Sequence, residues 1–338
     1  MPIKDQLHRP LRDLRISVID RCNFRCPYCM PDDQFDHAYQ FLDKNEWMSF
    51  DEIERLVRLF VGLGVEKVRL TGGEPLLRPH LDQLIRKLSA IEGIKDLALT
   101  TNGSLLDQCA LNLKTAGLRR LTVSLDTLDP EVFKKLSGAK GNVFSVLSGI
   151  RAAQKAGFDA IKLNAVIQRG VNDHTYLDLV DFARREGHTL RFIEYMDVGN
   201  QNHWDRSQVV PSQEIIATIK QKYPLEAIGG TEDGETSLRY RFADGKGKIG
   251  FISSVSHPFC GTCNRLRLSA DGKMYTCLFA TEGTDVLKSL RSGADDKTMI
   301  ALISAVWNQR QDRYSELRSQ IHQENPPKHK VEMFQIGG

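Results

Sequence analysis

No hydrophobic run in the 338-residue sequence approaches the roughly 18 residues that a transmembrane helix needs. The formal net charge is only +3, so composition gives no reason to expect binding to nucleic acid or to a membrane. The polar N-terminal stretch lacks the apolar segment of a secretion signal, which favours a cytoplasmic location. In that reducing compartment, clustered cysteines indicate metal binding or catalysis rather than disulfides.

Low-complexity segments are absent, and the one repeating feature is an alternation of strand-like and helix-like segments. Six strands are predicted, with helices between them, at about 15–19, 65–70, 96–100, 121–124, 160–167 and 189–196. This alternation predicts an α/β fold of parallel strands with crossover helices, as an open sheet or as a full or partial barrel. In both architectures, ligands bind at the carboxyl ends of the strands.

From about residue 200 the pattern changes. A helix is predicted at about 212–222, short strands at 238–242 and 248–253, and a further helix at about 294–309. Asp271-Gly272 predicts a hairpin turn between two more strands. We therefore predict one domain over residues 1–200 and an α+β extension over residues 201–338.

Six of the seven cysteines fall into two groups, and the first lies in the loop after the first strand. Cys22, Cys26 and Cys29 are separated by three and two residues. A [4Fe–4S] cluster usually takes four cysteines, so three would leave one iron open to a substrate or cosubstrate. The alternative is a zinc site shared with Cys260 and Cys263. That site would leave Cys22 unused and join ligands more than 200 residues apart.

The second group consists of Cys260, Cys263 and Cys277, and the predicted hairpin brings Cys277 back towards the other two. Three thiolates here could hold a second cluster that lacks one ligand, or a zinc ion completed by His257. The remaining Cys109 lies in a helical pattern, which predicts a small buried side chain.

Basic residues occupy strands that should be nearly all apolar if the sheet is covered on both faces. They are Arg15, Lys67, Arg69, Lys162 and Arg191. Each alone could be a solvated strand end, but together they predict a pocket for a polyanion, because buried charges are costly without a partner. Arg265 and Arg267 alternate with leucines beside the second cysteine group. Guanidinium groups suit phosphate oxygens, so the predicted ligand is a triphosphate.

Glycine pairs mark two further points. Gly72-Gly73-Glu74-Pro75 follows the second strand, where glycines let a ligand approach the backbone or serve an ordinary turn. Gly337-Gly338 closes the chain, as a frayed tail or as a segment that threads a narrow channel.

Together these motifs resemble the MoaA family, the radical S-adenosylmethionine (SAM) GTP cyclases of molybdenum cofactor biosynthesis. The resemblance rests on the CxxxCxxC loop with an aromatic residue before its last cysteine, the Gly-Gly-Glu-Pro turn, the CxxC-x13-C group, the run from Asn264 to Leu268, and the terminal glycines. It extends from about Leu11 to the end of the chain.

The resemblance implies a partial (βα)6 barrel whose C-terminal extension carries a second cluster. Cys22, Cys26 and Cys29 would hold the cluster that binds SAM, and Cys260, Cys263 and Cys277 one that meets the guanine. The SAM contacts would be Tyr28, Gly73, Ser124 and Met196. The GTP contacts would be Arg15, Arg69, Thr100, Lys162, Arg265, Leu266 and Arg267. Gly337 and Gly338 would reach the active site and, with Arg15, assist catalysis.

The implied reaction is the first step of molybdopterin synthesis. Reductive cleavage of SAM gives a 5′-deoxyadenosyl radical, which abstracts the ribose 3′ hydrogen of GTP. The carbon radical attacks guanine C8, and reduction of the aminyl radical gives 3′,8-cyclo-7,8-dihydro-GTP. An electron donor and a homodimer are also implied.

Two other functions remain open from the residues alone. A radical SAM enzyme that modifies peptides would usually carry more C-terminal cysteines. A non-catalytic metal-binding scaffold would leave the Gly-Gly turn and the strand cations unexplained.

Overall fold

The computed structural model describes residues 2–36, 38–228, 234–324 and 329–338. Six parallel strands build the first part of the chain: β1 (Asp13–Ser17), β2 (Lys67–Thr71), β3 (Asp96–Thr101), β4 (Arg120–Ser124), β5 (Lys162–Ile167) and β6 (Thr189–Glu194). Each pairs with the next in parallel. The six predicted strands are thus confirmed, with ends shifted by one or two residues.

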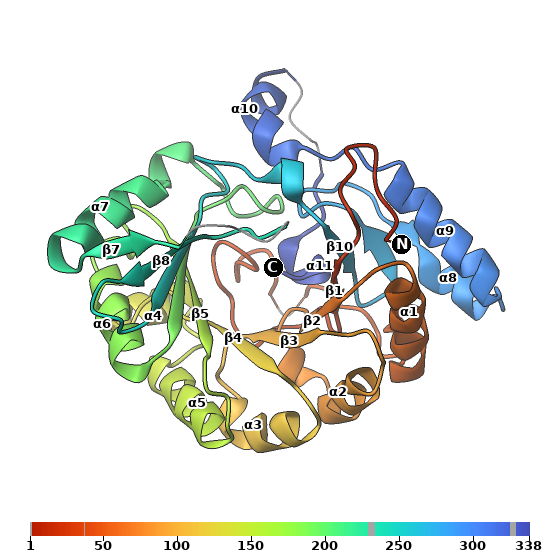
Figure 1. Ribbon diagram of the computed structural model, residues 1–338, viewed down its shortest axis with the longest axis horizontal. Helices are drawn as coiled ribbons and strands as arrows, with labels where there is room; N and C mark the ends of the chain where they lie inside the picture. Colours follow the sequence, from red (N-terminus) through yellow and green to blue (C-terminus); the bar gives the residue numbers. More distant parts are fainter. Residues whose placement is uncertain (1, 37, 229–233, 325–328) are drawn as a thin grey trace.

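Helices form an outer ring around these strands (Figure 1). They are α1 (Phe50–Gly62), α2 (Leu81–Ser89), α3 (Leu106–Thr115), α4 (Pro130–Leu136), α5 (Val143–Lys155), α6 (Tyr176–Glu186) and α7 (Ser212–Lys222). Helix α4 was not predicted, although Asp129 caps its first turn and Pro130 occupies its first position, both ordinary start signals.

Cys109 on α3 was predicted to be buried but is only half-buried, and its thiol lies 3.3 Å from the carbonyl of Leu105.

The strands of the C-terminal part extend the same sheet at both edges. They are β7 (Leu225–Ala227), β8 (Leu238–Phe242), β9 (Lys248–Ile252), β10 (Arg265–Leu268), β11 (Lys273–Tyr275) and β12 (Thr284–Asp285). β9 pairs in parallel with β6, and β10 pairs in parallel with β1. The order is β12-β11-β10-β1-β2-β3-β4-β5-β6-β9-β8-β7. The predicted hairpin joins β10 to β11.

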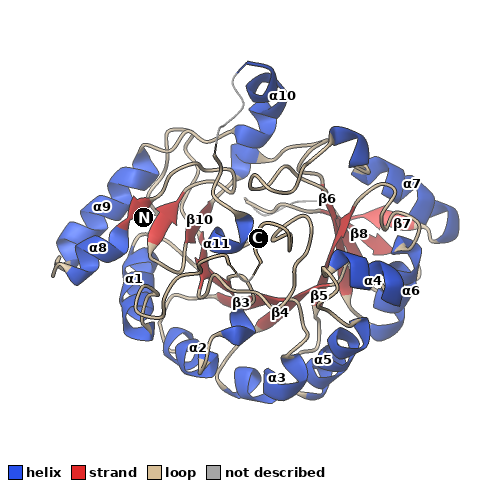
Figure 2. Cartoon of the chain, turned by 180° about the vertical axis from the view of Figure 1, so that it is seen from behind, coloured by secondary structure: helices blue, strands red, loops and turns tan. Residues whose placement is uncertain are grey.

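Four helices complete the C-terminal part: α8 (Val286–Arg291), α9 (Asp296–Asn308), α10 (Tyr314–Glu324) and α11 (Met333–Ile336). Helices α8 and α9 pack outside β10 and β11, whereas α11 and the C-terminus lie in the middle of the ring, as both views show (Figures 1 and 2). In the described parts of the chain, no helix is long and apolar enough to cross a membrane.

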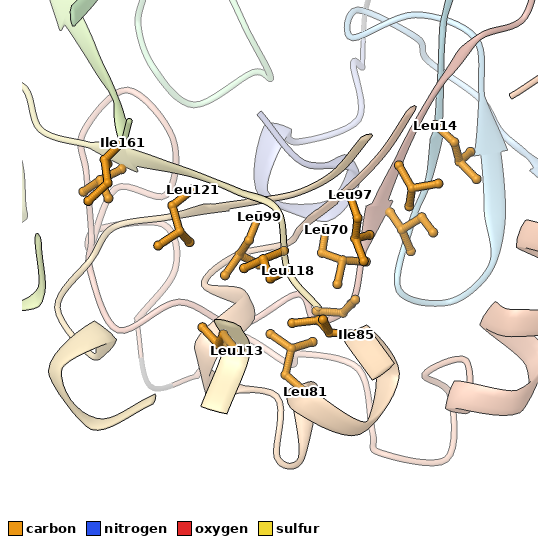
Figure 3. Packing of buried hydrophobic residues seen from close by; sticks show 14 of the residues in the cluster. Leu14, Leu70, Leu81, Ile85, Leu97, Leu99, Leu113, Leu118, Leu121 and Ile161 are labelled. Carbon is orange, nitrogen blue, oxygen red and sulfur yellow. The ribbon is translucent and has the colours of Figure 1, made fainter. Parts of the chain in front are cut away.

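Apolar side chains fill the layer between the strands and the helical ring. Leu70, Leu97 and Leu99 of the sheet face Leu81 and Ile85 of α2 (Figure 3). Successive side chains on a strand point to opposite faces, so the strands that present leucines outward present Arg69 and Thr100 inward. The helices therefore cover one face of the sheet and leave the other for polar residues. This is the predicted α/β barrel-like architecture with a C-terminal extension.

Candidate active site

A cavity at the carboxyl ends of the parallel strands contains both cysteine groups in its lining. Other predicted site residues that line it are Arg15, Tyr28, Arg69, Gly73, Thr100, Ser124, Met196, Arg265, Arg267 and Gly338. Lys162, Leu266 and Gly337 lie outside the lining. Leu266 is fully buried on the opposite face of β10 from the two arginines, so its side chain packs with the core.

The loop after β1 gathers the first three thiols. The amides of Cys29 and Met30 both donate to the carbonyl of Cys26, which turns the chain back at that point. Burial raises the pKa of Cys26, and the neighbouring Cys22 and Cys29 raise it further. The three thiols are therefore close enough to interact, and as thiolates they would need a positively charged group between them.

The Gly-Gly turn after β2 lies directly against this loop. The amide of Gly73 donates to the carbonyl of Ile19, and the amide of Glu74 to that of Arg21. A Cβ on Gly73 would lie 2.2 Å from the carbonyl oxygen of Arg21, so only glycine allows this approach. The turn thus fixes the position of the cysteine loop relative to β2.

Glu74 ties this turn to the end of β3. Its buried carboxylate accepts hydrogen bonds from the Thr101 hydroxyl (2.6 Å) and the Asn102 amide (2.7 Å). Burial raises its pKa to about 7. Nδ2 of Asn102 bonds the side chain of Asn23 and lies 4.0 Å from Sγ of Cys22. Neighbouring strand ends are therefore joined around the first cysteine group.

Tyr28 extends from the same loop to the end of β4. Its hydroxyl donates to Oδ2 of Asp126 at 2.7 Å, and the amide of Val166 on β5 donates to Oδ1. Burial raises the pKa of Asp126 to about 6. Asp126 and Ser124 both line the cavity, so β4 contributes two adjacent polar groups there.

The second cysteine group differs from the first because arginines surround it. Arg265 and Arg310 each donate to Sγ of Cys263 at 3.2 Å. Burial alone would raise the pKa of Cys263, but the two guanidiniums lower it to about 6. Burial raises the pKa of Cys277 to about 12, with Asp312 adding to the rise. Arginines thus stabilise one thiolate of this group before any ligand arrives.

Three arginines stand side by side on the inner face of the sheet. The strand register places Arg15 of β1 beside Arg267 of β10 on one side and Arg69 of β2 on the other. Burial and the neighbouring Arg267 lower the pKa of Arg15, and burial with Arg265 lowers that of Arg267 to about 10. Nε of Arg15 is buried without a hydrogen-bond partner among the described residues. Such a row of partly buried like charges is favourable only with an anion beside it.

Further cations continue this row across the sheet. Arg69 donates to the hydroxyl of Thr100 at 3.0 Å, and Arg191 donates to Oδ1 of Asn164 at 2.9 Å. Burial and three neighbouring arginines lower the pKa of Lys162 to about 7. We call Arg15, Arg69, Arg191, Arg265 and Arg267 the arginine row.

The C-terminal tail reaches the cavity next to the arginine row. Nη1 of Arg267 donates to the carbonyls of Ile336 and Gly337. A Cβ on Gly337 would collide with Thr71, and Gly338 lines the cavity. The terminal glycines could have formed a frayed tail or entered a channel, and in the structure the end of the chain lies in the cavity.

Two family models divide the chain between them. Residues 16–183 match the model of the radical SAM superfamily, and residues 188–316 match that of Molybdenum Cofactor Synthesis C. A GTP 3′,8-cyclase from Xanthomonas axonopodis pv. citri (strain 306) is 52% identical over 337 residues, which cover 100% of this chain and 99% of that protein. The chain belongs to the GTP 3′,8-cyclase family. The sequence-based assignment to that family is confirmed.

More distant members of the GTP 3′,8-cyclase family also align over nearly their whole length. The enzyme of Staphylococcus epidermidis (strain ATCC 35984) is 45% identical over 99% of both chains. Among solved structures, Streptococcus suis SuiB bound to its precursor peptide SuiA superposes with a TM-score of 0.61 at 16% identity, over 92% of this chain and 67% of SuiB. That likeness shows the fold alone. Membership of the radical SAM superfamily implies one [4Fe–4S] cluster and SAM.

The thiols of this family member fit that cofactor. Three half-buried cysteines from one loop line the cavity, and the glycine turn after β2 brings its backbone beside them. His257, which could complete a zinc site with the second cysteine group, is exposed and lies outside the cavity lining. In the described part of the chain, no three His, Cys, Asp or Glu side chains are arranged to hold one metal ion.

Several residues of this cyclase-family site were not predicted. Asp126 and Asn102 follow strand ends, so the rule that located Ser124 and Thr100 could have found them. Arg310 had no such signal, because it lies beyond the end of α9 in a polar stretch.

Proposed function

We propose that this protein converts GTP to 3′,8-cyclo-7,8-dihydroguanosine 5′-triphosphate, the first step of molybdenum cofactor biosynthesis. Membership of the cyclase family supports the reaction. The observation that carries the substrate is the arginine row, since a nucleotide triphosphate would neutralise several buried guanidiniums at once.

Two metal centres would flank the substrate. Cys22, Cys26 and Cys29 would hold the [4Fe–4S] cluster that binds SAM, and Cys260, Cys263 and Cys277 a second one facing the guanine. When loaded and reduced, the first centre supplies the electron that cleaves SAM, and the resulting 5′-deoxyadenosyl radical would remove the ribose 3′ hydrogen of GTP.

The chain's own residues bind and orient the reactants. Tyr28, Gly73, Ser124 and Met196 would contact SAM, where the missing side chain of Gly73 leaves room against the cysteine loop. Arg15, Arg69, Arg265 and Arg267, with Thr100, would bind GTP from the inner face of the sheet. Lys162, on β5 and two strands beyond Thr100, would add charge when protonated. Leu266 would contribute only through the position of the β10 backbone, because its side chain is buried in the core.

The tail would close the site. Gly337 and Gly338 would exclude water and hold Arg267 and, through it, Arg15 in position, since the carbonyl of Gly337 accepts from Arg267. The protein would require an electron donor, act as a homodimer and work in the cytoplasm, with residues 1–200 and 201–338 as its two domains.

A second candidate is the modification of a peptide, as the fold shared with a peptide-bound radical SAM protein allows. The arginine row favours the nucleotide, because a peptide backbone carries no charge to match it.

The deciding experiment incubates anaerobically reconstituted protein with SAM and a strong reductant, with and without GTP. Mass spectrometry follows 5′-deoxyadenosine and any product with the mass of dihydro-GTP or its hydrolysis products. A GTP-dependent rise in both is expected. Replacing Arg267 by Ala should weaken GTP binding and leave SAM cleavage without substrate largely intact, with Arg184→Ala on the outer ring as control. Deoxyadenosine formation that ignores GTP would reject GTP as the substrate.

A further inference from the structure

A buried carboxylate lies between the end of β6 and the C-terminal tail. Asp197 is 3% exposed and follows Met196, which lines the cavity. Its Oδ1 accepts from Nε of Arg318 on α10 at 2.8 Å. Its Oδ2 accepts from Nζ of Lys330 at 2.9 Å and from the hydroxyl of Tyr314. Among the described residues, this carboxylate therefore holds three groups that come from two separate C-terminal segments.

The cations of this group also surround an aromatic pair. The rings of Phe279 and Tyr314 stack with centroids 4.3 Å apart. Nζ of Lys330 lies 4.9 Å from the centroid of Tyr314, and the guanidinium of Arg318 lies 5.3 Å from that of Phe279. Phe279 follows Cys277 by two residues. The second cysteine group and the tail thus meet at the same place.

Further contacts lead from Lys330 directly into the tail. The amide of Lys330 donates to Oδ1 of Asn200, and Oε1 of Glu332 accepts from the Asn200 amide. The next turn is α11, where Phe334 is 1% exposed and packs against Phe35. Met333 and Phe334 of α11 line the cavity, as does Gly338 at the end of the chain. The position of Lys330 therefore determines how far the terminal glycines extend.

We propose that Asp197 is a positioning residue that holds the segment 329–338 through Lys330, so that the terminal glycines keep their place and Gly338 stays in the cavity. The inference rests on the proposed function only in assigning that tail a part in GTP turnover. Asp197 itself does not line the cavity, so its effect on the reaction passes through the tail.

Charge explains why this carboxylate, rather than the aromatic pair, decides the position of the tail. Lys330 is 9% exposed and Arg318 is 5% exposed, so both cations have lost most of their water. A buried ammonium without a counter-charge is strongly unfavourable. Nζ of Lys330 also donates to the backbone carbonyl of Asp197 at 2.6 Å, and an asparagine at this position would keep that bond. The charge of the carboxylate would be lost, so Lys330 would move to solvent and draw the tail with it, whereas Phe279 and Tyr314 could still stack.

Hydrogen exchange in the full-length, cluster-loaded protein tests the placement directly. In Asp197→Asn, amides of residues 333–338 should exchange at least about tenfold faster than in the unaltered protein, because their anchor is lost. Lys330→Met should do the same and is the milder variant, since Asp197 keeps Arg318 and Tyr314. It carries the test if Asp197→Asn does not fold.

Asp181→Asn is the matched control. Asp181 on α6 also accepts from a lysine, Lys222 at 2.8 Å, and from a tyrosine hydroxyl, that of Tyr223 at 2.6 Å. It lies on the outer ring, away from the cavity lining. Asp181→Asn should leave the hydrogen exchange of the amides of residues 333–338 unchanged. Tail exchange that stays slow in the folded Asp197 and Lys330 variants would overturn the proposal, as would faster exchange spread equally over α10 and β6.

A combination of variants separates positioning from a general structural effect. If Asp197 acts through the tail, Asp197→Asn combined with deletion of residues 337–338 should turn over GTP no more slowly than the deletion alone. Losses that multiply would show an independent role and reject the proposal. The exchange measurement needs no GTP, so it decides the position of the tail even if GTP proves not to be the substrate.

Discussion

Replacing Arg310 by methionine tests whether the arginines around Cys263 act on the proposed second metal centre. Arg310 is 4% exposed and donates to Sγ and to the carbonyl of Cys263, at 3.2 and 2.7 Å. It also contacts the carboxylates of Asp5 (3.3 Å) and Asp312 (3.2 Å). Methionine keeps an unbranched apolar stem over Trp307 and removes every one of these donors.

The stability that the Arg310→Met variant should lose depends on the contacts that the former partners of Arg310 keep. Asp5 still accepts from Nε of Arg9 at 2.6 Å, so it is not left as an isolated buried charge. The free energy of unfolding should therefore fall by about 3 kcal/mol, the lower end of what removal of one partner from a buried ion pair costs.

The expected effect on the proposed second centre is a lower reduction potential. Hydrogen bonds to ligand sulfurs stabilise the more negative, reduced state. If the lost bond favours that state by about 1 kcal/mol, the potential falls by roughly 40 mV, since about 59 mV corresponds to a tenfold change for one electron.

Both effects are measured in anaerobically reconstituted protein, by chemical unfolding and by a redox titration followed by electron paramagnetic resonance. The signal of the first centre, on Cys22, Cys26 and Cys29, should not shift. Arg184→Met is the control, because Arg184 also stacks on aromatic rings and pairs with Asp244, but on the outer ring. An unchanged potential of the second centre in the destabilised Arg310 variant would refute the reasoning and leave Arg310 a purely structural residue.

Three further predictions concern single positions. Gly73→Ala should lose most of its bound iron, because the new Cβ would collide with the carbonyl of Arg21. In the control Gly62→Ala the new Cβ meets no atom within 4 Å, so this variant should keep its iron. Equal iron contents in the two variants would contradict the close approach of Gly73 to the cysteine loop. The pKa of Lys162 is lowered to about 7, so GTP binding should take up a proton above that pH. The affinity for GTP, measured by calorimetry, should therefore fall by up to about tenfold per pH unit above pH 7. Lys162→Met should lose this pH dependence. An equally steep profile in the variant would exclude Lys162. Glu194→Gln should lower the free energy of unfolding in urea by about 2–4 kcal/mol, because the buried carboxylate accepts five hydrogen bonds and an amide nitrogen would face some of those donors. A change below 1 kcal/mol would show that the loop after β9 rearranges at little cost.

Local patterns explain which parts of the fold were predictable. Strand–helix alternation located six strands within one or two residues, and Asp271-Gly272 located the hairpin between β10 and β11. The alternation of Arg265 and Arg267 with leucines correctly assigned the two faces of β10, since Leu266 is fully buried while both arginines line the cavity. Period and turn chemistry are encoded within a few residues, so one sequence suffices to read them.

Pairings between distant segments were not predictable in the same way. Nothing local shows that β10 lies beside β1, and this pairing creates the row of Arg15, Arg69 and Arg267. The polar residues Asp5 and Arg9 give no sign in the sequence that they are buried against the second cysteine group. Charged residues are usually exposed, so burial of this kind depends on partners that only the folded chain supplies.

The pairing of β1 with β10 also limits the order in which the chain can fold during its synthesis. Asp13 lies beside Arg265, and 265 − 13 gives 252 residues that must be translated before β1 meets its second neighbour. At bacterial or eukaryotic rates of synthesis, the edge of β1 stays unpaired on the ribosome for on the order of 10–50 s. An open strand edge invites pairing with other chains. Nascent chains of this protein should therefore depend on chaperones until the hairpin of β10 and β11 has emerged.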